Sequence, residues 1–130
     1  LDKGAKLIVR ERLMTHGNQF AESTYNTELN GENSGADIVS RSVAKDNSRQ
    51  IFYSKLEGNA ACTGHTECDG IIMDNAKISA VPALDANNID ASLIHEAAIG
   101  KIAGEQLIKL MTLGLTEAEA EAQIVNGFLK

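Results

Sequence analysis

The sequence predicts a mainly β fold built from stacked strand-turn units and followed by two helices. Short segments rich in Val, Ile, Ser and Ala restart roughly every 10 to 15 residues and are separated by Gly, Asn and Asp. No amphipathic helix lies between these segments to make a β-α-β crossover. From Ile99 onward, the apolar residues recur at helical spacing instead.

The predicted strands alternate along their length. In ADIVSRSVAKD, Val39 and Val43 lie on one face and Ser40 and Ser42 on the other. The segments RQIFYSKLEGN, ECDGIIMDN, AKISAVPALDAN and DASLIHEA follow. Such stacked rungs are typical of a β-solenoid or of a sandwich, and the spacing alone does not decide between them. The many small residues in these segments fit the inward-facing stacks of a solenoid and favour it over a sandwich. Pro82 cannot donate a ladder hydrogen bond, so we expect it at a rung corner or on an edge.

The last quarter of the chain is predicted to form a helical hairpin. The first helix is expected to end at Gly114, and Thr116 and Glu119 form the N-cap box of the second helix. We therefore divide the chain into a β core, residues 1–97, and a helical region, residues 98–130, that packs on it and is also a candidate docking surface for a partner protein. The apolar positions that define the two helices are Ile99, Ala103, Leu107, Leu110 and Met111, then Ala118, Ala122, Val125 and Leu129.

Composition excludes several classes of partner. Asp and Glu outnumber Lys and Arg by 18 to 12, which gives a net charge of −6, and no basic cluster could neutralise phosphates. We expect no nucleic-acid partner. No apolar run approaches the ~20 residues of a membrane span, and the N-terminus does not resemble a signal peptide. We therefore expect a cytoplasmic protein, without a membrane partner, whose two cysteines are reduced thiols.

The stretch ACTGHTECDGIIMD contains both cysteines, Cys62 and Cys68, with His65 and Glu67 between them. Six steps of about 3.3 Å along a straight strand would separate the cysteines by about 20 Å, too far for one metal ion. A turn at Thr63 and Gly64 could bring them together, but C-x₂-H-x₂-C is not a paired zinc pattern. We interpret Cys62 as a core thiol. Taken alone, Cys68 is also typical of a packed small hydrophobic residue.

A second polar group lies in LIHEAAIGK, where we place His95 and Glu96 at the junction of the last strand and the first helix. A zincin would need a second histidine at the position of Ile99. No nucleophile elbow, phosphate loop or dinucleotide fingerprint is present either, so we expect no enzyme. As an isolated pair, His95 and Glu96 are typical of structural residues, because a carboxylate in a first helical turn complements the helix dipole.

Taken together and in order, these motifs resemble a known family. GNAACTGHTECDGIIMDNAKISAVPAL, DASLIHEAAIGKIAGEQL and GLTEAEAEAQIVNGF are similar to the C-terminal half of the SufB/SufD proteins of the SUF iron–sulfur cluster assembly system. The earlier stretches KGAKLIVRERLMTHG and ADIVSRSVAKDNSRQIFYSKLEG look like rungs of the same family, with looser matching.

The resemblance implies a right-handed parallel β-helix followed by a C-terminal helical domain. It also implies a role other than catalysis, as a scaffold that holds a nascent, transient iron–sulfur cluster. A SufC-type ATPase and another SufB/SufD-like subunit, or a second copy of this chain, are the implied partners. The alternative is a SufD-like structural partner of the ATPase that holds no cluster. The family's upstream sulfur-accepting cysteine has no counterpart in this sequence, which favours a fragment or a short member.

The resemblance also implies cluster and metal ligands. Cys68 matches the cysteine that SufB proteins use as a candidate ligand, Glu96 matches their nearby glutamate, and His95 matches the histidine that SufD proteins bring to the shared interface. Ile94 replaces a further glutamate that SufB proteins often have. Thiolate, imidazole and carboxylate groups all suit iron. Because adjacent strand residues point to opposite faces, we expect Cys68 of one subunit to face His95 or Glu96 of another.

Overall fold

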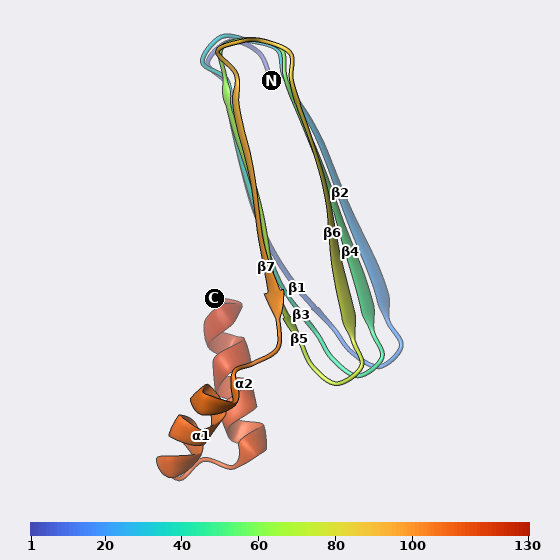
Figure 1. The fold of residues 1–130 in the computed structure, drawn as a ribbon, viewed down its shortest axis with the longest axis vertical. Helices are drawn as coiled ribbons and strands as arrows, with labels where there is room; N and C mark the ends of the chain where they lie inside the picture. The colour runs from blue at the N-terminus through green and yellow to red at the C-terminus, as the bar shows by residue number, and fades with distance from the viewer.

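Seven parallel strands wind into a β-solenoid of about three turns, and two helices follow it (Figure 1). The computed structural model describes residues 1–130 and confirms the predicted fold class. The strands are β1 (Lys6–Thr15), β2 (Phe20–Leu29), β3 (Gly35–Ala44), β4 (Arg49–Gly58), β5 (Thr63–Ile72), β6 (Lys77–Ala86) and β7 (Ser92–Gly100).

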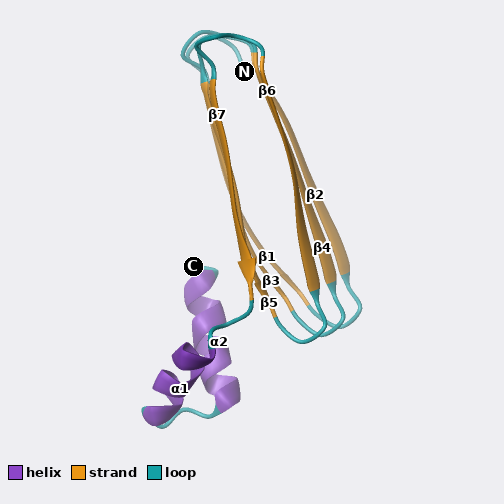
Figure 2. Ribbon diagram, in the orientation of Figure 1, coloured by secondary structure: helices purple, strands orange, loops and turns teal.

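The strands form two facing sheets. The odd-numbered strands make a four-stranded sheet in the order β1-β3-β5-β7, and the even-numbered strands make a three-stranded sheet in the order β2-β4-β6. All pairs are parallel, so each residue lies beside its equivalent one turn later, as Gly35 lies beside Thr63. Figure 2 shows the two sheets joined by turns at both ends of the strands.

The interior between the sheets is partly apolar and partly polar. Leu29, Leu56 and Cys62 form one buried cluster, on which Leu93 packs as expected for a stacked rung. Ile38, Phe52 and Cys68 form another buried cluster. The buried polar residues include Ser40, Ser42, Ser54, Thr66 and Gln50.

The alternation predicted for β3 is present, with the serines inside. Ser40 and Ser42 are buried between the sheets, whereas Val43 contacts Met73 and Val125 on the outer face, beneath the helices. Part of the polar interior is satisfied internally, since the amide of Gln50 donates to Thr15 Oγ1 (2.8 Å) and to the carbonyl oxygen of Val43 (2.9 Å). A buried polar core costs little when its groups are hydrogen-bonded in this way.

The turns repeat the same side chains from one rung to the next. At one end, Asn87 donates to Asn59 (2.8 Å), which donates to Asn30 (2.7 Å). At the other end, Asp46 and Asp74 both have a φ of 58°, which asparagine and aspartate tolerate better than most residues. The backbone N–H of Asp46 donates to the carboxylate of Asp74 at 3.1 Å.

The last rung leaves the solenoid open at its C-terminal end. β6 and β7 are the edge strands of the two sheets, and Pro82 lies on β6, which confirms its predicted place on an edge. Leu84 of β6 is 40% exposed, since no further rung covers it in a single chain. At the N-terminal end, β1 and β2 are the other edge strands of the two sheets, and neither pairs with a strand on its outer side.

The helical region begins later than expected. Ile99 belongs to β7, where it pairs with Gly70, and α1 covers Gly104–Thr112. The prediction of a helix from Ile99 was therefore wrong, because the ladder between β5 and β7 continues to Gly100 and takes up the backbone groups that a helix would need. No residue of α1 is buried. Neither helix has the length and apolar character that crossing a membrane requires.

The second helix, α2 (Glu117–Phe128), docks on the outer face of the odd-numbered sheet. Its capping box between Thr116 and Glu119 is confirmed. The buried face differs from the prediction, since Ala118 and Ala122 are exposed whereas Ala120 and Val125 are buried. The large side chains decide which face turns inward: Val125, Phe128 and Leu129 pack around Val43 and Met73, and alanines contribute too little apolar area to compete.

Candidate functional site

β5 and β7 carry the polar residues of the two motifs on two different faces. Even-numbered residues of β5 point between the sheets, so Cys68 lies inside with Thr66, and only 1% of its surface is exposed. Cys68 packs against Ile38 and Phe52. Burial, together with the nearby carboxylates of Asp69 and Glu11, raises the pKa of the Cys68 thiol to about 11. In the single chain, Cys68 is a protonated core thiol at neutral pH.

His95 also points inward and lies on β7, away from the strand–helix junction where the sequence predicted it. Its Nδ1 shares a hydrogen bond of 2.7 Å with Thr66 Oγ1. Burial lowers the pKa of His95, and the neighbouring His65 acts in the same direction. His95 is therefore a neutral imidazole at neutral pH, which is the form that binds a metal ion.

Glu96, the third predicted ligand, lies on the opposite face of the sheet. It pairs with Glu67 of β5, and its side chain is 65% exposed. Cys68 pairs with Ala97 and therefore shares the inner face with His95. The structure brings Cys68 and His95 to one face of adjacent strands, and it separates both from Glu96.

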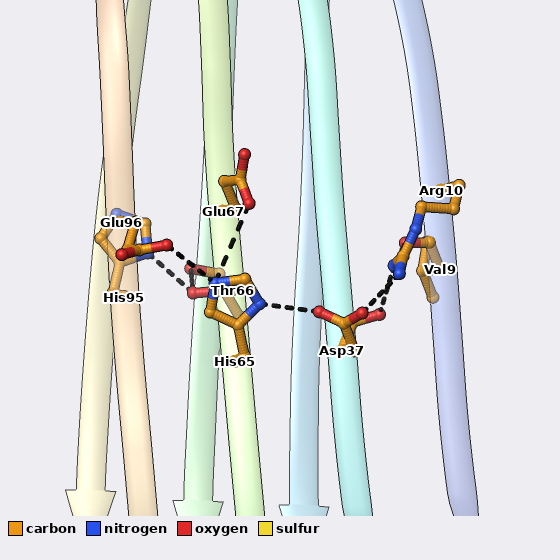
Figure 3. Close-up of polar contacts among 9 residues, drawn as sticks. Val9, Arg10, Asp37, His65, Thr66, Glu67, His95 and Glu96 are labelled. Atoms are coloured by element: carbon orange, nitrogen blue, oxygen red, sulfur yellow. Dashed lines mark hydrogen bonds and ion pairs between the residues drawn. The ribbon is translucent and has the colours of Figure 1, made fainter. Parts of the chain in front are cut away.

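The outer face carries a cluster of its own, which we call the outer-face cluster and define as His65, Glu67 and Glu96. His65 Nε2 lies 3.2 Å from a carboxylate oxygen of Glu96 and 3.9 Å from one of Glu67. One ligand atom from each residue lies within 4.8 Å of the other two. Figure 3 shows His65 between Asp37 on one side and Glu96 on the other.

His65 is held from the side of β3. Asp37 lies beside it in the ladder, and a carboxylate oxygen of Asp37 is 2.7 Å from His65 Nδ1. Asp37 is in turn paired with Arg10 of β1. The hydrogen bond to Asp37 raises the pKa of His65, with Glu96 acting in the same direction, and the same bond lowers the pKa of Asp37 with help from Arg10. Proximity to Asp69 raises the pKa of Glu67, and burial adds to the increase.

Sequence reasoning named Glu96 as a ligand but assigned no role to its neighbours His65 and Glu67. The signal was present in the rung length, since Glu96 lies beside Glu67 in the register, one turn later. Cys62 is confirmed as a core thiol: it lies in the cluster of Leu29 and Leu56, separate from that of Cys68, and both cysteines are free.

Together, the two-sheet solenoid, the buried cysteine and the histidine on the last strand define a β-solenoid protein with ligands of the kind that iron accepts. A comparison with protein families identifies the group. Residues 1–128 match the family described as "SUF system FeS cluster assembly, SufBD core domain". The chain belongs to this SufBD family, as the resemblance predicted.

Curated relatives agree with this assignment. An iron–sulfur cluster assembly SufBD family protein of Methanothermobacter thermautotrophicus is 44% identical over 103 residues, which cover 78% of this chain and 25% of the relative. The protein of the same name from Archaeoglobus fulgidus is 36% identical over 132 residues, which cover 100% of this chain and 36% of the relative. The chain thus spans between a quarter and little more than a third of the length of these two relatives.

Proposed function

We propose that this chain acts in iron–sulfur cluster assembly as a SufB/SufD-like scaffold component that holds a nascent cluster at a subunit interface. The observation that carries the proposal is the placement of Cys68 and His95 on the same inner face of β5 and β7. β7 is an edge strand, so a second subunit can approach this face without displacing a rung. The role is that of a scaffold in the cytoplasm and not of an enzyme.

The donor set supports a cluster as cargo. Cysteine thiolates are the usual protein ligands of iron–sulfur clusters, and histidine replaces cysteine on one iron of Rieske centres. The inner faces of β5 and β7 offer only these two ligands in one chain, and a cluster needs more. A second SufB/SufD-like subunit, or a second copy of this chain paired along β7, would bring another Cys68, His95 or Glu96 to the same interface. Because the pKa of Cys68 is about 11 in the single chain, iron must displace its proton.

Anaerobic reconstitution with Fe²⁺ and sulfide tests this proposal. The full chain is expected to develop visible cluster absorbance, and Cys68→Ser and His95→Ala are each expected to abolish it. Cys62→Ser is the matched control, because Cys62 is equally buried but lies in another cluster of the core. Circular dichroism confirms that each variant folds. Cluster formation by Cys68→Ser at the level of the parent would refute the assignment.

Mixing variants tests whether the site is shared between subunits. If Cys68 of one copy and His95 of another form each site, a dimer of one Cys68→Ser chain and one His95→Ala chain keeps one intact site and loses the other. Random pairing of equal amounts makes about half of the dimers mixed, so the mixture should regain about a quarter of the cluster absorbance of the parent. Failure of the mixture to regain any absorbance, while the variants still dimerise, would contradict a shared site.

The second candidate function is a SufD-like structural partner of a SufC-type ATPase that holds no cluster. The near-complete burial of Cys68 and the presence of Ile94 beside His95 favour it. In this case the parent chain forms no cluster under the conditions above but still binds the ATPase. Reconstitution therefore separates the two candidates.

For either candidate we propose that the two C-terminal helices dock the ATPase through α1 (Gly104–Thr112). Unlike α2, α1 has no buried residue, and it exposes the apolar side chains of Ile108 (62% exposed) and Met111, with Leu113 exposed at its C-cap. The first turn of α2, which carries Glu117 and Glu119, follows α1 after the short loop that joins the two helices. Ile108→Glu is expected to weaken capture of the ATPase without loss of stability. Glu121→Gln on α2 is the control and should leave capture unchanged. Unchanged capture by Ile108→Glu would exclude this surface.

A further inference from the structure

We infer that the outer-face cluster, His65, Glu67 and Glu96, is a binding site for a single first-row divalent cation such as Fe²⁺ or Zn²⁺. This site differs from the proposed cluster site on the inner face, and it needs neither Cys68 nor His95. It can be complete within one chain, because all three side chains come from the outer face of β5 and β7.

The spacing of the ligand atoms carries the inference. Around an ion bound at about 2.0 to 2.2 Å, neighbouring ligand atoms lie about 3.0 to 3.6 Å apart. His65 Nε2 and Glu96 already meet this separation at 3.2 Å, and His65 Nε2 and Glu67 exceed it only slightly at 3.9 Å. The ligand atoms of Glu67 and Glu96 lie within 4.8 Å of each other, and the Glu96 side chain is 65% exposed, so it can rotate to shorten this separation.

The support around His65 is that of a metal ligand. Histidine ligands usually donate their second ring nitrogen to a carboxylate, which fixes the tautomer and turns the other nitrogen toward the ion. Asp37 engages His65 Nδ1 at 2.7 Å, and Arg10 holds Asp37 from the next strand. His65 Nε2 is thereby directed at the two glutamates. This chain of contacts crosses all four strands of the sheet (Figure 3).

The charges of the cluster also favour a cation. Glu67 and Glu96 lie directly opposite each other in the ladder, an arrangement that is destabilising for like charges. A dication between the two carboxylates would remove this repulsion. One imidazole nitrogen and two carboxylate oxygens without a thiolate suit Fe²⁺, Mn²⁺ and Zn²⁺ better than a soft ion such as Cu⁺.

Isothermal titration of the metal-free full chain with Zn²⁺, in the absence of sulfide, tests the site. The parent is expected to bind one equivalent saturably. His65→Ala and Glu96→Gln should abolish this binding, and Glu96→Gln changes an exposed side chain, so it tests the site even if His65→Ala fails to fold. Asp37→Asn should weaken binding by about 10- to 100-fold, as expected for a residue that positions a ligand.

Three variants serve as controls that separate this site from the inner face. Cys68→Ser and His95→Ala are expected to bind Zn²⁺ like the parent even though they form no cluster, and His16→Ala changes a histidine in an exposed turn. Titration with Co²⁺ should produce no thiolate charge-transfer absorbance. Absence of saturable Zn²⁺ binding by the parent, or unchanged binding by Glu96→Gln, would overturn the inference and leave His65 as an ion-pair partner only. Loss of binding in Cys68→Ser would place the ion on the inner face instead.

Discussion

Cys68 and Glu96 lie on neighbouring strands but project from opposite faces of the same sheet. Cys68 is 1% exposed between the sheets, whereas the Glu96 side chain is 65% exposed on the outer surface. The sheet itself therefore separates them, and no rotation of their side chains brings them together in one chain. Any cluster that used both residues would have to take them from different subunits.

Gly58 and Gly127 provide opposite tests of the packing. A Cβ atom at Gly58 would lie 2.8 Å from the Cβ of Ala91, which cannot rotate away, so Gly58→Ala should destabilise the solenoid by about 1 to 3 kcal/mol. Nothing lies within 4 Å of a Cβ at Gly127 in α2, so Gly127→Ala should stabilise by about 0.5 to 1 kcal/mol. Urea unfolding measures both free energies, and the same sign for the two variants would contradict this account.

Val125 should control the docking of α2. It is buried against Val43 and Met73, and burying a valine side chain contributes about 1.5 to 3 kcal/mol. Val125→Ala should therefore release much of this free energy and accelerate amide hydrogen exchange in α2 before it affects the strands. Ala122→Gly, on the exposed face of the same helix, is the control for helix propensity alone. Equal exchange in the two variants would mean that Val125 does not anchor the helix.

Tyr25 should ionise at an unusually high pH. Burial, with the hydrogen bond to Glu11 at 2.9 Å, raises its pKa to about 12 from the ordinary 10.0. Because the folded pKa is raised, the associated stability is fully present below pH 10 and is lost as the pH rises toward 12. In Tyr53→Phe, where Tyr25 is the remaining tyrosine, phenolate absorbance should appear near pH 12. A midpoint near 10 in the folded protein would show that the contact with Glu11 is absent.

The capping box should make the stability of α2 depend on pH in the acidic range. The backbone N–H of Thr116 lowers the pKa of Glu119 below its ordinary 4.5, and the Thr116 hydroxyl acts in the same direction. Since the folded pKa is depressed, the cap stabilises α2 above pH 4.5, and this effect is lost as the pH falls through the folded pKa. Glu119→Gln should remove this dependence from the thermal unfolding of α2. Glu117→Gln, in the same turn but outside the box, should retain it.

The fold could be predicted because its signals are local. Alternation along β3, the absence of intervening helices and the capping box of Thr116 and Glu119 each arise within a few residues. The start of α1 could not be placed, because Ile99 fits both the strand alternation and the helical spacing. Only pairing with Gly70, a contact from another rung, decides between them.

The candidate site was less predictable because it depends on register. Neighbouring positions in a strand face opposite ways, so the separation of Cys68 from Glu96 depends on the pairing of Cys68 with Ala97. Predicting that His65 lies near Glu96 likewise requires knowledge of the number of residues in each rung. That length is visible in the repeated asparagines, Asn30, Asn59 and Asn87, once the turns are known to stack.

The rung length also limits how such a chain can change in evolution. Lys6 pairs with Gly35, 29 positions later, and Gly35 pairs with Thr63, 28 positions later. The difference of one residue is absorbed in the turns, because the paired strands have no bulge. One residue inserted within β5 would exchange Glu67 and Cys68 between the outer surface and the core. Whole rungs can therefore be gained or lost without disturbing β5 and β7, whereas a single-residue insertion in β5 would destroy both groups of ligands at once.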